Sequence, residues 1–434
     1  MNNKTILFLG ASNYFLDAAR YVKEKGYKLI AVDNQELPKA VVKSIADESY
    51  SISTIDIEKV YELCINKKVD GIYAGASEVN IPIAIELCER LGLPYYTNRK
   101  QWEMSTNKRI FKDKCIEHGI DVTETFDIGD DKLDDMKYYP LVTKPVDNNG
   151  STGISICKNK EQLKAGIDKA LNNSKSKNIL IERYIPSDSV IIQYTIQDGI
   201  VKYCGMSDKK SKKIEENAAP VMALQVFPSI HEAEYLESTN AKAIKMIKDQ
   251  EIEYGAIWIE SFYYDNKFIF NEIGFRYGGS LTYYPVEYFY GINQMEILIN
   301  HSLFGNGLYE NFSDLPETNH DKNKLYSILP IQIKPCTIKQ IRGIDKLRNI
   351  QGVHEFVQSH SVGDTIPGSG TTLQVFGYLH VTGNSIEEIN DTFKMSKEVL
   401  NVSNENDENM LFTIWEIWWK INSCIYHPKI YIHW

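Results

Sequence analysis

The sequence predicts a protein of mixed class, α/β in its N-terminal part and α+β beyond it. Short apolar runs alternate with helix-spaced segments over roughly the first hundred residues, and longer β-rich runs follow them. The 434 residues suffice for roughly two to four domains and a large core. A content of 43% hydrophobic and 24% charged residues is near the globular average and argues against disorder.

The alternation begins with an apolar run over residues 5–9, which ends at Gly10 and is followed by helical spacing over 15–22. It continues with expected strands at 28–32 and 71–74 and expected helices at 57–65 and 81–91. Strands that alternate with helices form a parallel sheet with helices on both faces. Residues 1–98 are therefore predicted to form a domain with such a parallel sheet.

Residues 99–315 have a different pattern and are predicted to form a second domain, bounded by polar breaks near 98–101 and 311–324. Its first expected elements are a helix at 105–118, a strand that ends in a Gly-rich turn at 141–153, and a helix at 161–172. A mixed segment, 316–405, follows, with strands expected near 327–333 and 374–381 and a helix near 386–396. Residues 406–434 form a Trp-rich tail.

The composition argues against several classes of protein. A net charge of −10 argues against a general nucleic-acid coat protein, whose affinity for phosphates depends on surplus Lys and Arg. The polar start of the chain predicts no signal peptide, and no stretch has the roughly 18 apolar residues of a membrane-spanning helix. The seven cysteines form no C-x-x-C pair, and the nine histidines form no helical metal pair. We expect a cytoplasmic protein with reduced thiols.

The turn after the first predicted strand has one feature of a dinucleotide site. Gly10 permits a sharp turn, and Asp33 ends the second strand, where a ribose-binding acid lies in dinucleotide-binding folds. Only one glycine of the G-x-G-x-x-G pattern is present, so a pyrophosphate could not approach the backbone closely. An NAD-dependent oxidoreductase is therefore a weaker interpretation than a scaffold domain without a dinucleotide.

A lysine and a Gly-rich loop indicate a phosphate site. An apolar strand delivers Lys144, and the loop that follows contains Gly150, Ser151, Thr152 and Gly153. Backbone N–H groups and hydroxyls in such a loop donate to phosphate oxygens, while the ammonium supplies positive charge. The loop lacks the G-K-[ST] ending of a P-loop, and a plain β-turn after an edge strand is an equally good interpretation.

A further strand has an acid near its end, Glu182, followed by Tyr184 and Ile185. The carboxylate would accept an amino N–H of a flat base, and free backbone groups at Tyr184 and Ile185 would read the edge of the ring. The alternative is an ordinary strand that runs into a turn ended by Pro186, and the local pattern alone favours it.

The segment 256–273 is the most informative part of the chain. It predicts a β-hairpin, and a three-residue loop at 265–267 would place Glu260 directly across from Glu272. Two acids side by side on an apolar face repel each other, and a divalent cation removes that repulsion. Hard oxygen ligands favour Mg²⁺ over zinc. The alternative is a two-residue turn, which would place the acids on opposite faces.

The residues around this pair extend the prediction. In the three-residue register, both acids share a face with Trp258, Phe262 and Phe270. Arg276 follows the second acid in a Gly-rich segment, where its bidentate guanidinium would hold a carboxylate or a transferring phosphoryl group. A solvated surface arginine is the default alternative, and the position beside the hairpin makes it less favoured.

Taken in order, these segments resemble the ATP-grasp superfamily over about residues 5–400. The resemblance implies a Rossmann-like domain at 1–98, a two-part nucleotide clamp at 99–315 with a lid at about 115–187, and a closing C-terminal segment at 316–405. It implies phosphate-binding Lys108 and Lys144, a flap at 149–153, an adenine-reading hinge at Glu182, Tyr184 and Ile185, magnesium-binding Glu260 and Glu272, and a catalytic Arg276.

Two positions depart from the family pattern. The Asn expected after the second acid is Gly274, which removes one oxygen ligand and leaves open whether one or two Mg²⁺ bind. The ribose-binding acid falls at Ser189, with Asp188 as a substitute. Glu78 lies in a stretch that resembles the substrate-facing part of the N-terminal domain and is a further candidate.

Within residues 332–400, the segments 335–343, 352–353, 363–364 and 374–377 resemble the C-terminal region of amino-acid-ligase and carboxylase-like members of the superfamily. The chain as a whole resembles L-amino-acid ligases and carbamoyl-phosphate-synthase-like proteins. The implied reaction joins a carboxylate to an amine through an acyl phosphate and releases ADP and phosphate. It implies ATP with Mg²⁺, or Mn²⁺ in its place, and small-molecule substrates. A non-catalytic ATP-binding pseudoenzyme or sensor, suggested by Gly274 and Ser189, is the alternative.

Two segments have no assigned role. The run 208–213 contains four lysines and predicts either a solvated loop or a loop that closes over the triphosphate. The tail from 410 to 434 holds four of the six tryptophans. We expect it to form a helix on the protein's own core, with a homodimer or membrane-surface contact as the alternative.

Overall fold

The computed structural model describes residues 4–147, 153–213, 220–315, 323–368 and 370–411. Contacts divide the chain into two compact units. The first consists of Met1–Met206 and Ala233–Asn319, and the second of Ser207–Glu232 and His320–Trp434. Each unit is described by itself below, and the four-part division expected from the sequence stays a prediction.

The N-terminal part of the first unit is a four-stranded parallel sheet, as predicted. Its strands are β1 (Thr5–Leu9), β2 (Lys28–Val32), β3 (Glu48–Tyr50) and β4 (Gly71–Tyr73), in the order β3-β2-β1-β4. The connecting helices are α1 (Leu16–Glu24), α2 (Ile57–Lys67) and α3 (Asn80–Leu91). The predicted runs at 5–9 and 28–32 match β1 and β2. These strands are buried throughout or nearly so, which explains why their sequences are largely apolar.

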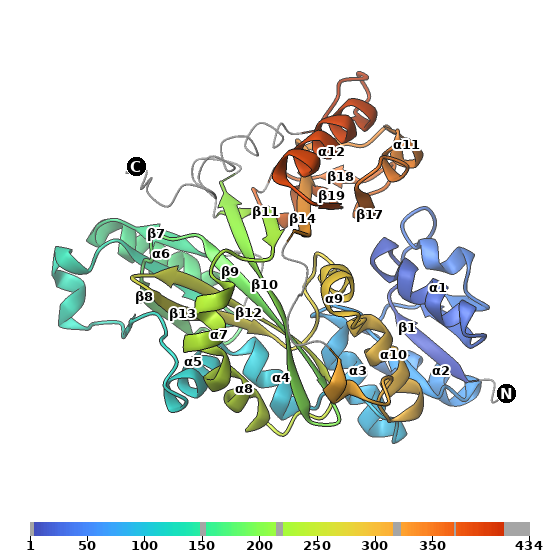
Figure 1. Ribbon diagram of the computed structural model, residues 1–434, viewed down its shortest axis with the longest axis horizontal. Coiled ribbons are helices and arrows are strands. Elements are labelled where there is room, and N and C mark those ends of the chain that lie inside the picture. Colours follow the sequence, from blue (N-terminus) through green and yellow to red (C-terminus); the bar gives the residue numbers. More distant parts are fainter. Residues whose placement is uncertain (1–3, 148–152, 214–219, 316–322, 369, 412–434) are drawn as a thin grey trace. The chain divides into compact units, whose positions relative to one another are not determined.

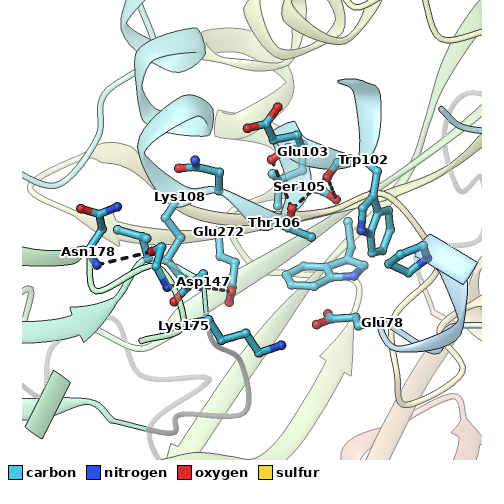
Figure 2. A pocket seen from close by; sticks show the side chains of 16 residues that line it. Glu78, Trp102, Glu103, Ser105, Thr106, Lys108, Asp147, Lys175, Asn178 and Glu272 are labelled. Carbon is cyan, nitrogen blue, oxygen red and sulfur yellow. Dashed lines mark hydrogen bonds and ion pairs between the residues drawn. The ribbon is translucent and has the colours of Figure 1, made fainter. Parts of the chain in front are cut away.

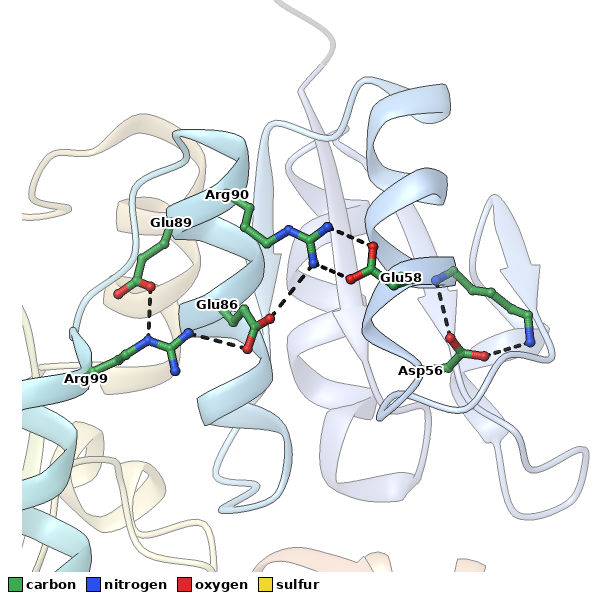
Figure 3. Close-up of polar contacts among 7 residues, drawn as sticks. Asp56, Glu58, Glu86, Glu89, Arg90 and Arg99 are labelled. Carbon is green, nitrogen blue, oxygen red and sulfur yellow. Dashed lines mark hydrogen bonds and ion pairs between the residues drawn. The ribbon is translucent and has the colours of Figure 1, made fainter.

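Surface ion pairs connect α2, α3 and the start of the next helix (Figure 3). The Arg90 guanidinium on α3 donates to both Glu58 oxygens on α2, at 2.7 and 2.8 Å. Arg99 lies 3.2 Å from Glu89 and 3.4 Å from Glu86. Exposed pairs of this kind contribute about 0–1 kcal/mol each, so the apolar core determines the packing of these helices.

The helix expected at 105–118 corresponds to α5 (Lys108–Glu117) but begins three residues later than predicted. A separate helix, α4 (Arg99–Thr106), precedes it. Asn107 separates them: its backbone is extended, and its side chain accepts the backbone N–H groups of Arg109 and Ile110. This cap places Lys108 in the first turn of α5, where its side chain contacts Glu272.

A small antiparallel sheet forms the part of the first unit that was expected as a lid. Its strands are β5 (Thr125–Phe126), β6 (Leu141–Pro145), β7 (Ser155–Cys157) and β8 (Ile179–Arg183), in the order β5-β8-β6-β7. Helix α6 (Lys160–Asn173) packs on β6 and β7 through Leu163 and Ala170. The strand expected at the start of 141–153 corresponds to β6, which ends at Pro145, and most of the turn expected after it lies outside the described residues.

The larger sheet of the first unit has the order β13-β12-β9-β10 (Figure 1). Its strands are β9 (Ser189–Gln197), β10 (Ile200–Lys212), β12 (Gly255–Tyr264) and β13 (Lys267–Gly274). The helices of this region are α7 (Glu232–Ser238), α8 (Asn240–Lys248), α9 (Tyr283–Tyr290) and α10 (Gln294–Phe304). Phe111 of α5 stacks on Phe270 of β13, with ring centroids 6.3 Å apart, and so fixes α5 against this sheet.

The second unit contains the end of β10 and the strands that follow it in the order β11-β14-β19-β17. These are β11 (Val221–Phe227), β14 (Leu325–Gln332), β17 (Val353–Gln358) and β19 (Val375–Gly383), with helices α11 (Ile344–Arg348) and α12 (Ile386–Val399). Two short pairs complete it: β15 (Cys336–Thr337) with β18 (Thr365–Ile366), and β16 (Gln340–Arg342) with β20 (Asn401–Ser403). The strands and the helix predicted near 327–333, 374–381 and 386–396 correspond to β14, β19 and α12.

The lysine-rich run is not a loop, in contrast to both interpretations of the sequence. Lys209 and Lys210 lie within β10 and pair with Gln225 and Leu224 of β11. Asp208, which is buried, accepts hydrogen bonds from the Ser229 hydroxyl at 2.6 Å and the Ile230 N–H at 3.1 Å. The lysines are part of a strand despite their charge, because pairing with β11 satisfies the backbone N–H and C=O groups of this part of β10.

The remaining expectations concern membrane-spanning helices, the cysteines and the C-terminal tail. Among the described residues, no helix is long and apolar enough to cross a membrane, and the six cysteines found there are unpaired. The tail prediction lies outside the described residues from 412 onward, as does Cys424.

Candidate active site

The structure places Glu260 of β12 directly across from Glu272 of β13, as the sequence predicts. The predicted three-residue loop is nevertheless wrong. Tyr264 pairs with Lys267, so the turn has two residues, Asp265 and Asn266, with φ values of 52° and 56°. Two successive positive φ angles are typical of the tight turns that connect twisted antiparallel strands.

A β-bulge reconciles the short turn with the pairing of the acids. The register shifts between Glu260 and Ser261, and Asn271 is the extra residue on β13. The bulge brings Glu272 back to the face of Glu260, which a regular two-residue hairpin would have prevented. Phe270 pairs with Ser261 and lies on the opposite face, so its predicted position beside the acids is wrong.

One acid of the pair, Glu272, has a cationic partner in this structure. The Lys108 ammonium lies 3.1 Å from Glu272 Oε1, and the Glu272 side chain is 30% exposed. Two adjacent carboxylates that are partly open to solvent and already balanced by an ammonium fit a hard divalent cation. Within the described residues no group of three or more His, Cys, Asp or Glu side chains has metal-binding geometry, so any such ion needs further oxygen ligands from elsewhere.

Gly274 is explained by its neighbour Trp258. The two residues pair in register, and a Cβ built on Gly274 would lie 2.3 Å from Cε2 and Nε1 of the Trp258 indole. No side chain fits at this position while the indole is present. The family pattern has an Asn at this position, which would supply an oxygen ligand. In this chain the Trp258 ring occupies the space beside the acids instead.

Arg276 is buried rather than solvated. Its Nη2 lies 2.5 Å from Glu78 Oε1, and its Nη1 donates to the Tyr277 carbonyl at 3.0 Å. The guanidinium also lies over the Trp258 ring, 5.5 Å from the centroid. The ion pair supports Glu78 as a site residue, since it brings the N-terminal domain segment to the arginine beside the hairpin.

A buried cluster of three charges joins α5 to the small sheet. Lys112 and Lys144 each lie 2.6 Å from one oxygen of Glu182, and all three side chains are nearly inaccessible. Burial by itself would raise the pKa of Glu182, but the two ammonium groups outweigh it and lower the pKa below its ordinary value. Burial lowers the pKa of Lys112, against the attraction of Glu182.

The sequence interpretation missed Lys112 and Asn271. Lys112 lies one helical turn after Lys108 on α5, so their i, i+4 spacing was the available signal. The Lys144 ammonium donates to Asn271 Oδ1 at 3.0 Å. Nothing in the sequence marked Asn271, because its position depends on the bulge.

The hinge residues differ from the prediction in two respects. The Glu182 carboxylate lies between two ammonium groups and is not directed to a base. The Tyr184 N–H is not free, since it donates to the Pro140 carbonyl at 3.1 Å and extends the pairing of β6 with β8. The Ile185 carbonyl accepts from Ser187 at 2.9 Å, whereas its N–H has no acceptor among the described residues. Of the two backbone N–H groups expected to bind the edge of a base, only that of Ile185 therefore matches the prediction.

The other nucleotide-site residues are only partly described. Gly150, Ser151 and Thr152 lie outside the described residues. Gly153 has a φ of +82°, and a Cβ there would lie 2.8 Å from both Asn173 and Pro145, so the backbone passes closely between them. Ser189 is buried at the start of β9 and pairs with Phe262, and its contact with a ribose stays a prediction.

A cavity of about 420 Å³ lies beside these groups. Figure 2 shows Lys108, Asp147 and Asn178 at one end and Trp102 and Glu78 at the other, with Glu272 between them. A second cavity of about 340 Å³ lies between the N-terminal segment and the segment after β13, and its lining includes Gly10, Asp33, Asn80 and Tyr277. Asp33 accepts the N–H groups of Ala11 and Gln35, so it stabilises the turns after β1 and β2.

Comparison with known proteins identifies the fold. Residues 122–253 match the family model described as D-ala D-ala ligase C-terminus. The L-amino acid ligase from Bacillus licheniformis superposes with a TM-score of 0.72 at 17% identity, over 93% of this chain and 100% of that one. The chain has the ATP-grasp fold. The biotin carboxylase domain of 2-oxoglutarate carboxylase from Hydrogenobacter thermophilus, in complex with MgADP and bicarbonate, gives a TM-score of 0.77 at 18% identity, over 96% and 93%.

Curated relatives of this ATP-grasp chain are distant in sequence. The carbamoyl phosphate synthase large chain of Caldanaerobacter subterraneus is 25% identical over 246 residues, which are 53% of this chain and 23% of that protein. The chain thus matches about a quarter of the length of that relative. The formate-dependent phosphoribosylglycinamide formyltransferase of Bacillus velezensis is 24% identical over 63% of this chain and 71% of its own length.

Proposed function

We propose that this ATP-grasp protein is a ligase that joins a carboxylate to an amine through an acyl phosphate and releases ADP and phosphate. One observation supports the proposal above the others: four groups from separate segments meet at the end of β13. Lys108 contacts Glu272, Lys144 contacts Asn271, and Glu260 lies across from Glu272. Arg276 follows two residues after Gly274, where β13 ends.

The reaction consists of two displacements. In the first, a carboxylate oxygen attacks the γ-phosphorus of ATP, the bond from that phosphorus to the β–γ bridging oxygen breaks, and ADP leaves. In the second, the amine nitrogen attacks the acyl carbon, the bond from that carbon to the phosphate oxygen breaks, and phosphate leaves while the nitrogen loses a proton. Neither step needs a covalent bond to the protein, so catalysis depends on positioning and charge.

The residues of this chain match those requirements. Lys108 and Lys144 would bind phosphate oxygens, and the Arg276 fork would hold the substrate carboxylate in line with the γ-phosphoryl group. The Ile185 N–H would donate to the edge of the adenine. Glu260 and Glu272 would hold a divalent cation, Mg²⁺ or Mn²⁺, which supplies further positive charge to the phosphates.

The relatives support this class of reaction more than a specific substrate. Their printed names include an L-amino acid ligase, a formate-dependent formyltransferase and biotin carboxylases. The non-catalytic alternative rested on Gly274 and Ser189. It is not favoured, because Trp258 accounts for Gly274, and both lysines, both acids and the arginine are retained.

The test is a screen of paired carboxylates and amines for release of ADP and phosphate, with mass detection of the ligated product. We expect Mg²⁺-dependent, stoichiometric formation of ADP, phosphate and product, and a loss of at least about 100-fold in kcat for Glu272→Gln. Glu117→Gln, on the exposed side of α5, is the matched control. ATP binding without turnover across the panel, or full activity of Glu272→Gln, would contradict the proposal.

A further inference from the structure

We propose that the carboxylate substrate has an aromatic side group and that Trp102 and Trp258 form its pocket. The inference rests on the proposed ligase function and concerns the end of the 420 Å³ cavity that Trp102 and Trp258 line. The chain has six tryptophans, and only these two belong to the described residues. Both line this cavity, together with Pro82 and Ile273.

The cavity has two chemically different ends. Lys108 and Asp147 lie at the end toward the acid pair, and Trp102 lies at the other (Figure 2). Trp258 belongs to the same end as Trp102, since its ring contacts Arg276, whose partner Glu78 lies beside Trp102 in Figure 2. The Trp102 end is aromatic and also holds charge, since Glu78 lies there with its partner Arg276. An aromatic wall beside a guanidinium fits a molecule that has one anionic group and one aromatic group.

The position of Trp258 depends on a specific feature of the chain. Its indole lies against Gly274, where any side chain would collide with it. A ring held on bare backbone forms a flat, rigid wall, and flat walls favour planar ligands because rings stack with little loss of conformational entropy. The Trp258 Nε1–H has no acceptor in the described part of the chain, and neither does Arg276 Nε–H. These two buried donors lie on either side of the cation–π contact.

Trp102 provides the second wall from a different element. Asn98 caps α4 with its side chain, and the capping box with Gln101 fixes the first turn of that helix. Trp102 follows in the next turn and is 8% exposed. The two walls therefore come from a capped helix and a strand, and such supports hold a pocket more rigidly than loops do.

Charge assigns the pocket to the carboxylate and not to the amine. The Arg276 guanidinium lies over the Trp258 ring, so a carboxylate held by it would lie beside the aromatic end. Glu78 pairs with Arg276 at 2.5 Å, and a substrate carboxylate would compete with Glu78 for the guanidinium, whereas the guanidinium would repel an ammonium group. An amine would thus enter from another direction.

The experiment uses hydroxylamine as the nucleophile, because it traps acyl phosphates as hydroxamates without knowledge of the natural amine. Carboxylates that differ only in side group are compared, namely 3-phenylpropanoate, 4-methylpentanoate and propanoate, and L-phenylalanine, L-leucine and L-alanine. We expect kcat/KM for the aromatic member to exceed that for the smallest member by at least about tenfold, which is typical of filling an apolar pocket. Trp258→Leu and Trp102→Leu should each remove most of this preference and leave KM for ATP within about twofold.

A binding measurement accompanies the kinetics. Calorimetric titration of 3-phenylpropanoate and propanoate into the protein with Mg²⁺ and a non-hydrolysable ATP analogue should show tighter binding of the aromatic acid. Trp258→Phe should retain the preference in part, and Tyr264→Leu, an exposed aromatic at the hairpin end, should retain it in full.

The two proposals fail in distinguishable ways. Aromatic selectivity in binding without hydroxamate from any carboxylate would contradict the ligase function and support the pocket. Equal binding and equal rates for all side groups, unchanged in Trp258→Leu, would overturn the aromatic pocket while the ligase function stands.

Discussion

The ammonium of Lys112 lies 2.6 Å from Oε1 of Glu182, inside the protein where neither side chain is more than 5% exposed. Lys144 binds the other oxygen at the same distance. A lysine and a glutamate alone would form a neutral pair, and the second lysine leaves the cluster with a net positive charge. We therefore predict that Lys112 is a positioning residue, which would let Lys144 face a triphosphate with its charge uncompensated.

Lys112→Met tests this role. The substitution keeps the length and apolar stem of the side chain and removes the charge, so Glu182 and Lys144 become a neutral buried pair. We expect ATP binding to weaken at least tenfold, equivalent to about 1.4 kcal/mol, and the free energy of unfolding to fall by about 3 kcal/mol. Calorimetric ATP titration and urea denaturation measure the two effects.

Lys114→Met is the control on the same helix. Lys114 pairs with Glu117 at 2.8 Å on the exposed face, and its side chain is 33% exposed. Its loss should change stability by less than about 1 kcal/mol and leave ATP affinity unchanged. ATP affinity that is equal in Lys112→Met and Lys114→Met would mean that Lys112 has no influence on the nucleotide site.

Arg276→Lys should separate turnover from nucleotide binding. A lysine retains the charge, but it lacks the planar fork that contacts Glu78 and Tyr277 together. We expect kcat to fall about 100-fold with KM for ATP changed by less than about threefold, measured by hydroxamate formation. Loss of ATP affinity with kcat retained would place Arg276 at the nucleotide instead of the carboxylate.

Gly274 and Trp258 should behave as one unit in a double-mutant cycle. Gly274→Ala places a Cβ 2.3 Å from the indole, so we expect a loss of about 1–3 kcal/mol in stability. In Trp258→Leu the ring is absent, and Gly274→Ala should then cost much less. Urea denaturation of the four proteins gives the coupling energy, expected at about 1 kcal/mol or more. Additive effects would mean that the backbone moves to admit the methyl group.

His118 should make stability depend on pH near neutrality. It follows α5, and its two ring nitrogens contact Asp249 at 2.9 Å and the Lys114 carbonyl at 2.8 Å. The hydrogen bond to Asp249, followed by that to Lys114, raises the pKa of His118 above its ordinary value. The protonated form is thus favoured in the folded protein. Its stabilising effect is complete below about pH 6.5 and is lost as the pH rises through the folded pKa.

Urea denaturation between about pH 5.5 and 8.5 should show stability falling with pH in this range. Asp249→Asn removes the main cause of the raised pKa, so the slope should become smaller in that variant, and His118→Gln should remove it. A slope that is unchanged in His118→Gln would assign the pH dependence to another group.

The local pattern of the chain was enough to predict much of the fold. The alternation of strands and helices predicted the parallel N-terminal sheet, because after its first residue each of β1 and β2 is apolar and buried. The same local pattern predicted the pairing of Glu260 with Glu272. It did so through an incorrect loop length, since a bulge at Asn271 and a two-residue turn together give the same register.

Residue types in order along the chain therefore determined the class of protein, the two acids, the lysines at 108 and 144, and the arginine after the hairpin. Only the tertiary structure decided what these groups contact. Lys112 joins Glu182 across 70 residues of sequence, Arg276 joins Glu78 across 198, and the Trp258 ring occupies the space above Gly274. Such contacts depend on burial and on backbone positions fixed by packing, which periodicity does not encode, because periodicity reports the faces of single elements and not the neighbours that cover them.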